Sequence, residues 1–214
     1  MKKISEPSRK RLVELAQILR HVKSKRITSV QLEQMTGWSN ASIRKDISSL
    51  GYIGGVSNGY EVSELLEQIC LTLNIAKDDE DSKNRGILHK CCIVGLAKLG
   101  AALLENSIFY NSGFSVIAGF DSNVNRTEIL SASFPLYPAS KMNVVIPQSQ
   151  IEYAILTVSA ETAQSMADRL VLSGIKGIVN MTNVVLAVPK NIKVINLSVV
   201  NSLMELSVGT QPVK

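Results

Sequence analysis

The stretch that decides the fold of most of this chain is Cys91-Cys92-Ile93-Val94-Gly95-Leu96-Ala97-Lys98-Leu99-Gly100. It is a short apolar run that ends in a glycine-containing turn and opens directly into a helix-like segment. Strand, turn and helix in this order form an anion site, because free N–H groups at a helix start point at a phosphate. The sequence therefore predicts a nucleotide-binding α/β unit in the middle of the chain.

A second short strand, Ser115–Phe120, ends in Asp121, about twenty residues past the last glycine of the turn. A carboxylate at this place accepts hydrogen bonds from dinucleotide ribose hydroxyls, so Asp121 is a candidate ribose ligand; the alternative is a structural aspartate at a strand end. The turn itself departs from Gly-x-Gly-x-x-Gly, since Ala97 stands at the middle glycine, where the backbone approaches the pyrophosphate closely. We expect its methyl group to push the phosphates outward or to weaken binding.

Strands alternate with helices over the rest of this part, which predicts a Rossmann-like, doubly wound parallel sheet. The expected strands are 88–94, 115–120, 134–136, 152–158, 177–180 and 193–196, and the expected helices are 98–110 and 161–172. Ligands bind outside the carboxyl ends of such strands. The candidate nucleotide-binding residues at these ends are Gly95, Leu96, Ala97, Lys98, Leu99, Gly100, Asp121, Ser122, Thr157, Val158, Ser159, Asn180 and Thr182.

The front third is predicted to be a winged helix-turn-helix. Apolar residues at helical spacing predict helices over 9–22, 30–36 and 40–50. Gly37 ends the second as a left-handed cap, and Ser39 caps the third after a very short turn. Two short helices joined in this way are typical of a helix-turn-helix. The Asn58-Gly59 pair between β-prone runs predicts a hairpin, and a hairpin at this place is a wing.

A fourth helix is expected after the wing, capped by Ser63. Its apolar residues at helical spacing predict the face that packs inward. The members of this face are Leu65, Leu66, Ile69, Leu71 and Leu73.

The third helix carries the candidate DNA contacts. Ala41, Ile43, Ile47 and Leu50 are expected to face inward, leaving small polar and basic side chains for base edges and phosphates. The alternative is a plain helical hairpin with a solvated polar face. The candidate DNA-binding residues are Ser39, Asn40, Ser42, Arg44 and Lys45 on the helix and Ser57 and Asn58 on the wing.

Charge is distributed unevenly along the 214 residues. Residues 1–76 carry eleven Lys/Arg against seven Asp/Glu, whereas residues 77–214 carry twelve against eleven. A basic front favours a polyanion partner for that part alone, although solvated surface lysines give the same balance. Residues 77–86 are polar, charged and without periodicity, which predicts a linker. The expected organisation is a DNA-binding domain over 1–76, a linker over 77–86, a Rossmann-like domain over 87–196 and a C-terminal helix and tail over 197–214.

The sequence also indicates several classes to which the protein does not belong. The three cysteines lack metal-ligand spacing and are expected to be buried apolar residues in a reducing cytoplasm. We expect no signal peptide, no membrane span and no metal site. His21 and His89 both lie away from the ligand loops, so no catalytic set is proposed and an oxidoreductase is disfavoured.

Four stretches carry a resemblance to a known family: Ala41–Asp46, Ala154–Val158, Ala163–Leu170 and Gly174–Asn180. Together with a winged helix in front of a Rossmann domain, they resemble Rex, the bacterial redox-sensing transcriptional repressors. The resemblance implies a homodimer that binds a palindromic operator in successive major grooves. It also implies that a C-terminal helix, here 197–206, swaps between subunits, and that NADH binding closes the dimer and releases DNA. NADH and NAD would be effectors and not redox substrates.

The chain departs from the pattern of that family at several positions. Ala97 replaces a glycine of the nucleotide turn, and Gly55-Val56 replaces a Lys-Arg pair of the wing. Ser159 and Asn183 stand where proline is usual. Asn196 stands where the family has an aspartate paired with an arginine that matches Arg11. These changes predict an altered operator affinity or ligand response, and the alternative function is a nucleotide- or coenzyme-A-binding regulatory module with weak or lost DNA or NADH response.

Overall fold

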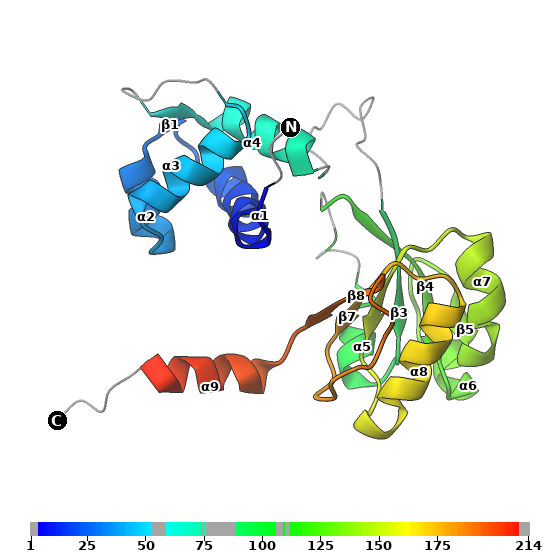
Figure 1. Cartoon of the computed structure of the whole chain (residues 1–214). Coiled ribbons are helices and arrows are strands. Elements are labelled where there is room, and N and C mark those ends of the chain that lie inside the picture. Colours follow the sequence, from blue (N-terminus) through cyan, green and yellow to red (C-terminus); the bar gives the residue numbers. More distant parts are fainter. Residues whose placement is uncertain are drawn as a thin grey trace. The chain divides into compact units, whose positions relative to one another are not determined.

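The computed structural model describes residues 4–52, 59–73, 75, 89–105, 109 and 112–209. The predicted linker, Ser57, Asn58 and Gly55-Val56 lie outside these residues. The chain divides into two compact units (Figure 1). One comprises Met1–Ile87 with Asn111–Gly113, and the other comprises Leu88–Tyr110 with Phe114–Lys214.

The first unit is a helix-turn-helix with a small antiparallel sheet. Its elements are α1 (Glu6–His21), β1 (Arg26–Ile27), α2 (Ser29–Thr36), α3 (Asn40–Ser49), β2 (Tyr60–Glu61) and α4 (Val62–Leu73). Thr28 caps α2 through a reciprocal capping box with Gln31, and Gly37 ends α2 in the left-handed conformation at φ 71°. The side chain of Ser39 accepts the N–H of Ser42 and starts α3. β1 and β2 pair antiparallel, as a winged helix requires.

Several predicted details of this unit are wrong. α1 begins at Glu6 because Ser5 caps it. α4 begins at Val62, so Ser63 lies inside its first turn and does not cap it. Leu71 is 66% exposed, because it lies one position past Cys70, the last buried residue of α4. Ala41 is also exposed, two positions before Ile43 in the buried stripe of α3. In α3 that stripe contains Ile43, Ile47 and, unexpectedly, the charged Asp46.

The second unit is a parallel sheet of six strands, as predicted. The strands are β3 (His89–Val94), β4 (Phe114–Asp121), β5 (Leu136–Pro138), β6 (Tyr153–Leu156), β7 (Gly177–Asn180) and β8 (Lys193–Asn196). Their order is β5-β4-β3-β6-β7-β8, so the chain moves outward from β3 to one edge and then returns to fill the other. This is the doubly wound Rossmann order, with its switch point between β3 and β6.

Both faces of the sheet are covered. Cys92 and Val94 of β3 enter one apolar cluster with residues of α7 (Met142–Gln148) and α8 (Ala160–Leu172). Cys91 and Ile93 point the other way, into a cluster with Leu104, which follows α5 (Lys98–Ala102). Alternation along one strand therefore supplies both halves of the core.

The helices of this unit differ from prediction in extent. The helix expected over 98–110 ends at Ala102, where the last turn tightens and Leu104 becomes buried. The short α6 (Val124–Ile129), α7 and the 3-10 turn η2 (Ala139–Lys141) were not predicted. The third strand lies two residues later than expected, because Leu136 pairs with Gly119 of β4 while Phe134 packs in the core.

The C-terminal helix α9 spans Val199–Gly209 and not 197–206. Leu197 still donates its N–H to the carbonyl of Asn180 at 2.8 Å, which prolongs the strand-like backbone and delays the helix. Leu203 and Met204 of α9 are each 60% exposed. Within the described residues, none of the helices combines the length and apolarity that crossing a bilayer demands.

Candidate DNA-binding helix and nucleotide site

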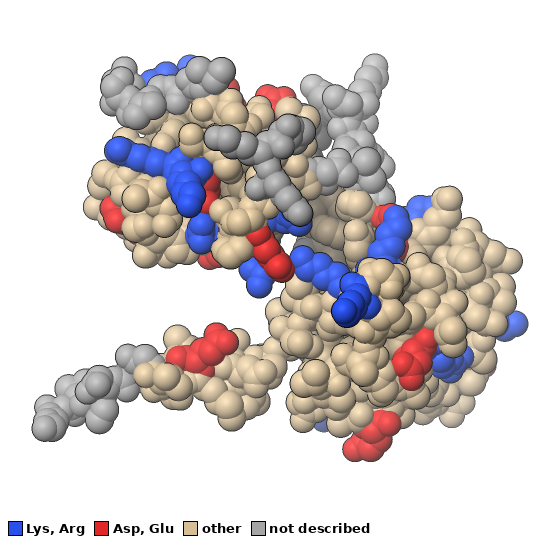
Figure 2. Space-filling view, in the orientation of Figure 1, with Lys and Arg blue, Asp and Glu red and all other residues tan. Residues whose placement is uncertain are grey.

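The outer face of α3 is polar and basic. Arg44 and Lys45 are exposed, as is Ser39, whereas Asn40 and Ser42 are half-buried. Arg44 is held in place, because its Nε donates to Ser29 Oγ of α2 at 3.2 Å. Figure 2 shows Lys and Arg side chains gathered over the α2–α3 part of this unit. The arrangement presents cations from a rigid helix, which suits contacts to a phosphate backbone and to base edges.

A buried ion pair fixes α3 from behind. Arg11 of α1 donates from Nε to Asp46 Oδ2 at 2.6 Å and from Nη2 to Oδ1 at 3.0 Å. Asp46 is 4% exposed and Arg11 is 30% exposed. The hydrogen bond to Asp46 raises the pKa of the Arg11 guanidinium. Arg11 is therefore engaged within its own unit, on the helix that carries the candidate DNA contacts.

The nucleotide turn is held by close backbone approach at two glycines. A Cβ on Gly100 would lie 1.8 Å from the carbonyl oxygen of Gly95. Gly95 has φ 95°, and its Cβ would lie 2.8 Å from Val158. Thr157 Oγ1 donates to the carbonyl oxygens of Val94 at 3.2 Å and Gly95 at 2.6 Å. The turn is thus fastened to the end of β6, on the other side of the switch point.

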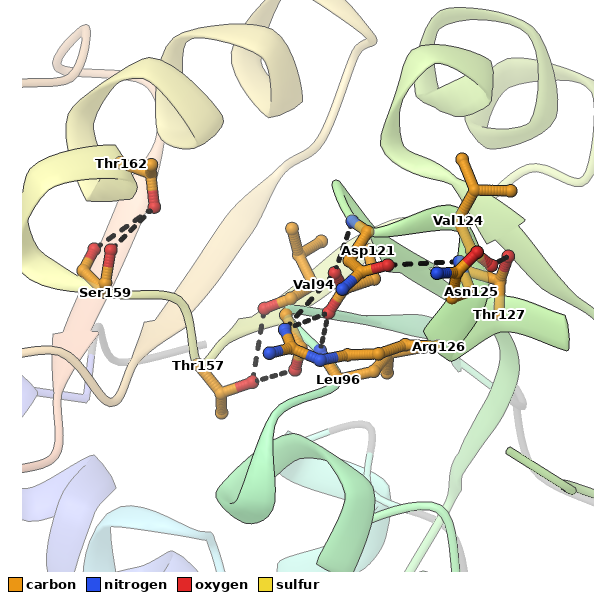
Figure 3. A network of polar contacts seen from close by, with 12 residues as sticks. Val94, Leu96, Asp121, Val124, Asn125, Arg126, Thr127, Thr157, Ser159 and Thr162 are labelled. Carbon is orange, nitrogen blue, oxygen red and sulfur yellow. Dashed lines mark hydrogen bonds and ion pairs between the residues drawn. The ribbon is translucent and has the colours of Figure 1, made fainter. Parts of the chain in front are cut away.

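Asp121 fastens the same turn from the β4 side (Figure 3). Its Oδ2 accepts the N–H of Leu96 at 2.6 Å, and its Oδ1 accepts the N–H of Asn123 at 2.7 Å. The residue is 4% exposed. Arg126 Nη1 lies 3.4 Å from Oδ2 and 3.5 Å from Oδ1. The carboxylate holds the turn and receives a cation, so Asp121 has the structural role that was the alternative to ribose binding.

The other predicted turn residues separate into an inner and an outer set. Leu96 and Gly100 are buried, while Ala97, Lys98 and Leu99 are exposed along the start of α5. Ala97 occupies the N-cap position in extended conformation and makes no side-chain cap. The exposed side chains of this turn are therefore those of Ala97, Lys98 and Leu99.

The loops after the neighbouring strands contain both exposed and inward-facing residues. Ser122 and Ser159 are exposed and Val158 is half-buried. Asn180 is fully buried and donates to the carbonyl of Val184 at 2.8 Å and to Asn196 Oδ1 at 2.9 Å. Its Oδ1 accepts the N–H and the hydroxyl of Thr182. Asn180 and Thr182 shape the loop, and Asn196 is bound by Asn180.

The thiols at the centre of the sheet are not reactive groups. Cys91 and Cys92 are buried, as is Cys70 in the first unit. Burial raises the pKa of the Cys91 thiol to about 12 and also raises that of Cys92. Since the thiolate is the form that reacts with oxidants, these side chains are packing groups. Among the described residues, no cluster of three or more His, Cys, Asp or Glu could hold a metal ion.

Comparisons with known proteins match both units. Residues 88–184 match the family described as CoA binding domain, and residues 3–48 match the one described as Putative DNA-binding protein N-terminus. Among solved structures, the chain is similar to RSP, a Rex-family repressor, in complex with beta-NAD+ and operator DNA. The TM-score is 0.82 at 26% identity, covering 97% of this chain and 92% of that one. RSP in complex with beta-NADH matches with a TM-score of 0.80 at 27% identity, covering 97% and 94%.

Sequence relatives agree with the structural neighbours. The chain is 32% identical over 213 residues to the "Redox-sensing transcriptional repressor Rex" of Limosilactobacillus reuteri (strain DSM 20016), covering 96% of this chain and 92% of that protein. It is 35% identical over 181 residues to the protein of the same name in Leuconostoc citreum (strain KM20), covering 85% and 79%. A helix-turn-helix, a Rossmann sheet and this extent of identity make the chain a member of the Rex family of redox-sensing transcriptional repressors.

Proposed function

We propose that this protein is a homodimeric transcriptional repressor that binds palindromic operator DNA and releases it when NADH occupies the Rossmann unit. The observation that carries the proposal is the presence, in one chain, of a basic helix-turn-helix and a Gly95–Gly100 turn at the switch point of a doubly wound sheet. The relatives are named as repressors and RSP was solved with beta-NAD+ and operator DNA. NADH and NAD+ are effectors here, and the protein is not an enzyme.

The candidate contacts follow from exposure. On the DNA side we propose Ser39, Arg44 and Lys45, with Asn40 and Ser42 beside them. On the nucleotide side we propose the outer set of the turn for the pyrophosphate and the Asp121 region for the adenosine ribose. The buried candidates are proposed to hold these contact residues in place by packing and hydrogen bonds, and they are Leu96, Gly100, Thr157, Asn180 and Thr182.

Sensing by a bound dinucleotide also fits the chemistry of the thiols. The buried Cys91 and Cys92 stay protonated at neutral pH, so a redox response through them is disfavoured. Cys91 and Cys92 are free thiols, which suits the reducing cytoplasm in which a bacterial repressor meets its operator. The exposed apolar side chains of α9 suit a contact with a second subunit, as a dimer requires.

The test is fluorescence anisotropy with labelled duplex DNA. Selection from a pool of random palindromic duplexes supplies the operator, and the full-length protein is titrated with and without NADH and NAD+. We expect binding that weakens steeply with salt, because phosphate contacts release counterions, and that weakens further with NADH. Failure to bind any duplex at low salt would overturn the proposal.

A pair of variants separates a specific contact of Arg44 with the operator from a general effect of the positive charge of the protein. Arg44→Ala is expected to abolish operator binding, whereas Lys190→Ala, which removes the same charge from the exposed surface of the other unit, is expected to leave it unchanged. Fluorescence of Trp38, which packs against the core of the first unit, verifies that Arg44→Ala stays folded.

The second candidate function is a coenzyme-A- or nucleotide-binding regulatory module. The match of residues 88–184 to the CoA binding domain favours it. Mass spectrometry of small molecules released from the purified protein distinguishes the two. Retained coenzyme A, together with no DNA binding that depends on salt concentration in the anisotropy titration, would support this second function. Retained NADH would support the first.

A further inference from the structure

Arg126 of α6 lies against the carboxylate at the end of β4. Its Nη1 is 3.4 and 3.5 Å from the two oxygens of Asp121, and Figure 3 shows its side chain reaching across towards Leu96. The Asp121 side chain is 4% exposed, whereas that of Arg126 is 46% exposed. One partner of this pair is therefore fixed in the fold while the other extends into solvent.

The two partners also differ in how firmly they are held. Asp121 is anchored by backbone N–H groups at 2.6 and 2.7 Å, and moving it would release the nucleotide turn. The contacts of Arg126 to Asp121 are long for charge-assisted hydrogen bonds, which are ordinarily 2.7–2.9 Å. A half-exposed guanidinium with such contacts gains little from them, so a ligand displaces it at small cost.

This arrangement bears on which dinucleotide the site accepts. In a Rossmann unit an acid at this strand end binds the ribose 2′-hydroxyl, and it repels a 2′-phosphate, whereas a nearby arginine accommodates the phosphate. Here both groups stand together. With Arg126 withdrawn from Asp121, the remaining lone pairs of the carboxylate would be open to ribose hydroxyls. Towards a 2′-phosphate, the planar guanidinium would offer two parallel N–H donors.

We propose that Arg126 is a specificity-determining residue of this site and that it allows the protein to accept the 2′-phosphorylated dinucleotide, NADPH, beside NADH. The proposal rests on the proposed function, since it concerns the same nucleotide site. Ser122 and Asn125, both exposed and next to this pair, offer further hydrogen bonds to a phosphate. The repressor would then respond to the total pool of reduced nicotinamide dinucleotides.

The experiment is a pair of calorimetric titrations, with NADH and with NADPH, of the full-length protein freed of nucleotide. For the wild type we expect dissociation constants within about tenfold of each other, because the charge of Arg126 offsets that of Asp121. Arg126→Gln should weaken NADPH binding by about tenfold or more and change NADH binding by no more than about threefold.

Two control variants frame this result. Lys98→Gln at the pyrophosphate end is expected to weaken both dinucleotides by the same factor. Lys190 lies three residues before β8, and therefore at the amino ends of the parallel strands, opposite the carboxyl ends where the ligand binds. Lys190→Gln is expected to change the affinity for neither dinucleotide. Circular dichroism shows whether each variant keeps its fold.

The outcomes separate the two proposals. If the wild type binds neither dinucleotide, the proposed function fails. If NADH binds but the wild type rejects NADPH by more than about a hundredfold, or Arg126→Gln weakens both dinucleotides equally, the role of Arg126 is overturned while the repressor function stands.

Discussion

The ion pair between Arg11 and Asp46 yields a prediction about both stability and DNA binding. Arg11→Met keeps the apolar stem of the side chain but leaves the Asp46 carboxylate, 4% exposed, without its cation. Removing one partner of a buried pair costs about 3–5 kcal/mol. Since Arg11 is 30% exposed, water reaches the site in its place, and we expect a loss of about 2–3 kcal/mol in the unfolding free energy of the first unit.

The chain contains its own probe for this measurement. Trp38 is its single tryptophan and packs against the core of the first unit, so its fluorescence in urea follows that unit separately from the Rossmann unit. Arg9→Met removes an exposed charge from the same helix and serves as the matched control, with an expected change below about 0.5 kcal/mol. Operator affinity of Arg11→Met should also fall, because α3 loses the contact that orients it.

A second substitution tests the cause. In Arg11→Met/Asp46→Leu the carboxylate is gone, so most of the lost stability should return. If Arg11→Met costs no more than Arg9→Met, or if the double variant is no more stable than Arg11→Met, the pair does not hold α3 as described.

Three further predictions concern the second unit. Gly100→Ala places a Cβ 1.8 Å from the Gly95 carbonyl oxygen, so we expect loss of NADH binding in calorimetry and a lower melting temperature; unchanged binding would contradict the close packing of the turn. Leu203→Glu puts a charge on the exposed apolar side of α9 and should give a monomer by light scattering, whereas a persisting dimer would place the interface elsewhere. Hydrogen bonds from Lys176 and His89 lower the pKa of Glu152, so its stabilisation is present above about pH 4.5 and disappears as pH falls through the lowered value. Glu152→Gln should therefore unfold more easily than the wild type at neutral pH and equally easily in strong acid, and an equal deficit at both pH values would refute this.

Much of the fold was predictable because local chemistry and global architecture agree. The Gly37 cap and the Ser39 cap define the helix-turn-helix without reference to the rest of the chain. The apolar run ending in Gly95 likewise predicts a buried parallel strand and its turn. These features depend on backbone conformation and periodicity, which a sequence displays directly.

The candidate sites were less predictable because they depend on which groups meet in space. Asp46 occupies a buried position of α3, and the one available signal was its spacing from Ile43 and Ile47. Asp121 was identified as a ligand position, but its bond to the Leu96 N–H joins residues 25 apart in sequence, and Arg126 became relevant through that contact alone. Asn180 and Thr182 were assigned to the ligand by their position in a loop, although their hydrogen bonds turn them inward.

The buried amide of Asn180 has a mechanical consequence. The side chain donates hydrogen bonds to the Val184 carbonyl and to Asn196, and so joins the loop over residues 182–184 to the end of β8. The backbone carbonyl of Asn180 accepts the N–H of Leu197, two residues before α9 begins. The loop after β7, at the carboxyl ends of the strands, and the start of the C-terminal arm at Leu197 are consequently held together by hydrogen bonds of one residue. The position of this loop and the position at which the C-terminal arm leaves the sheet are therefore coupled through one side chain.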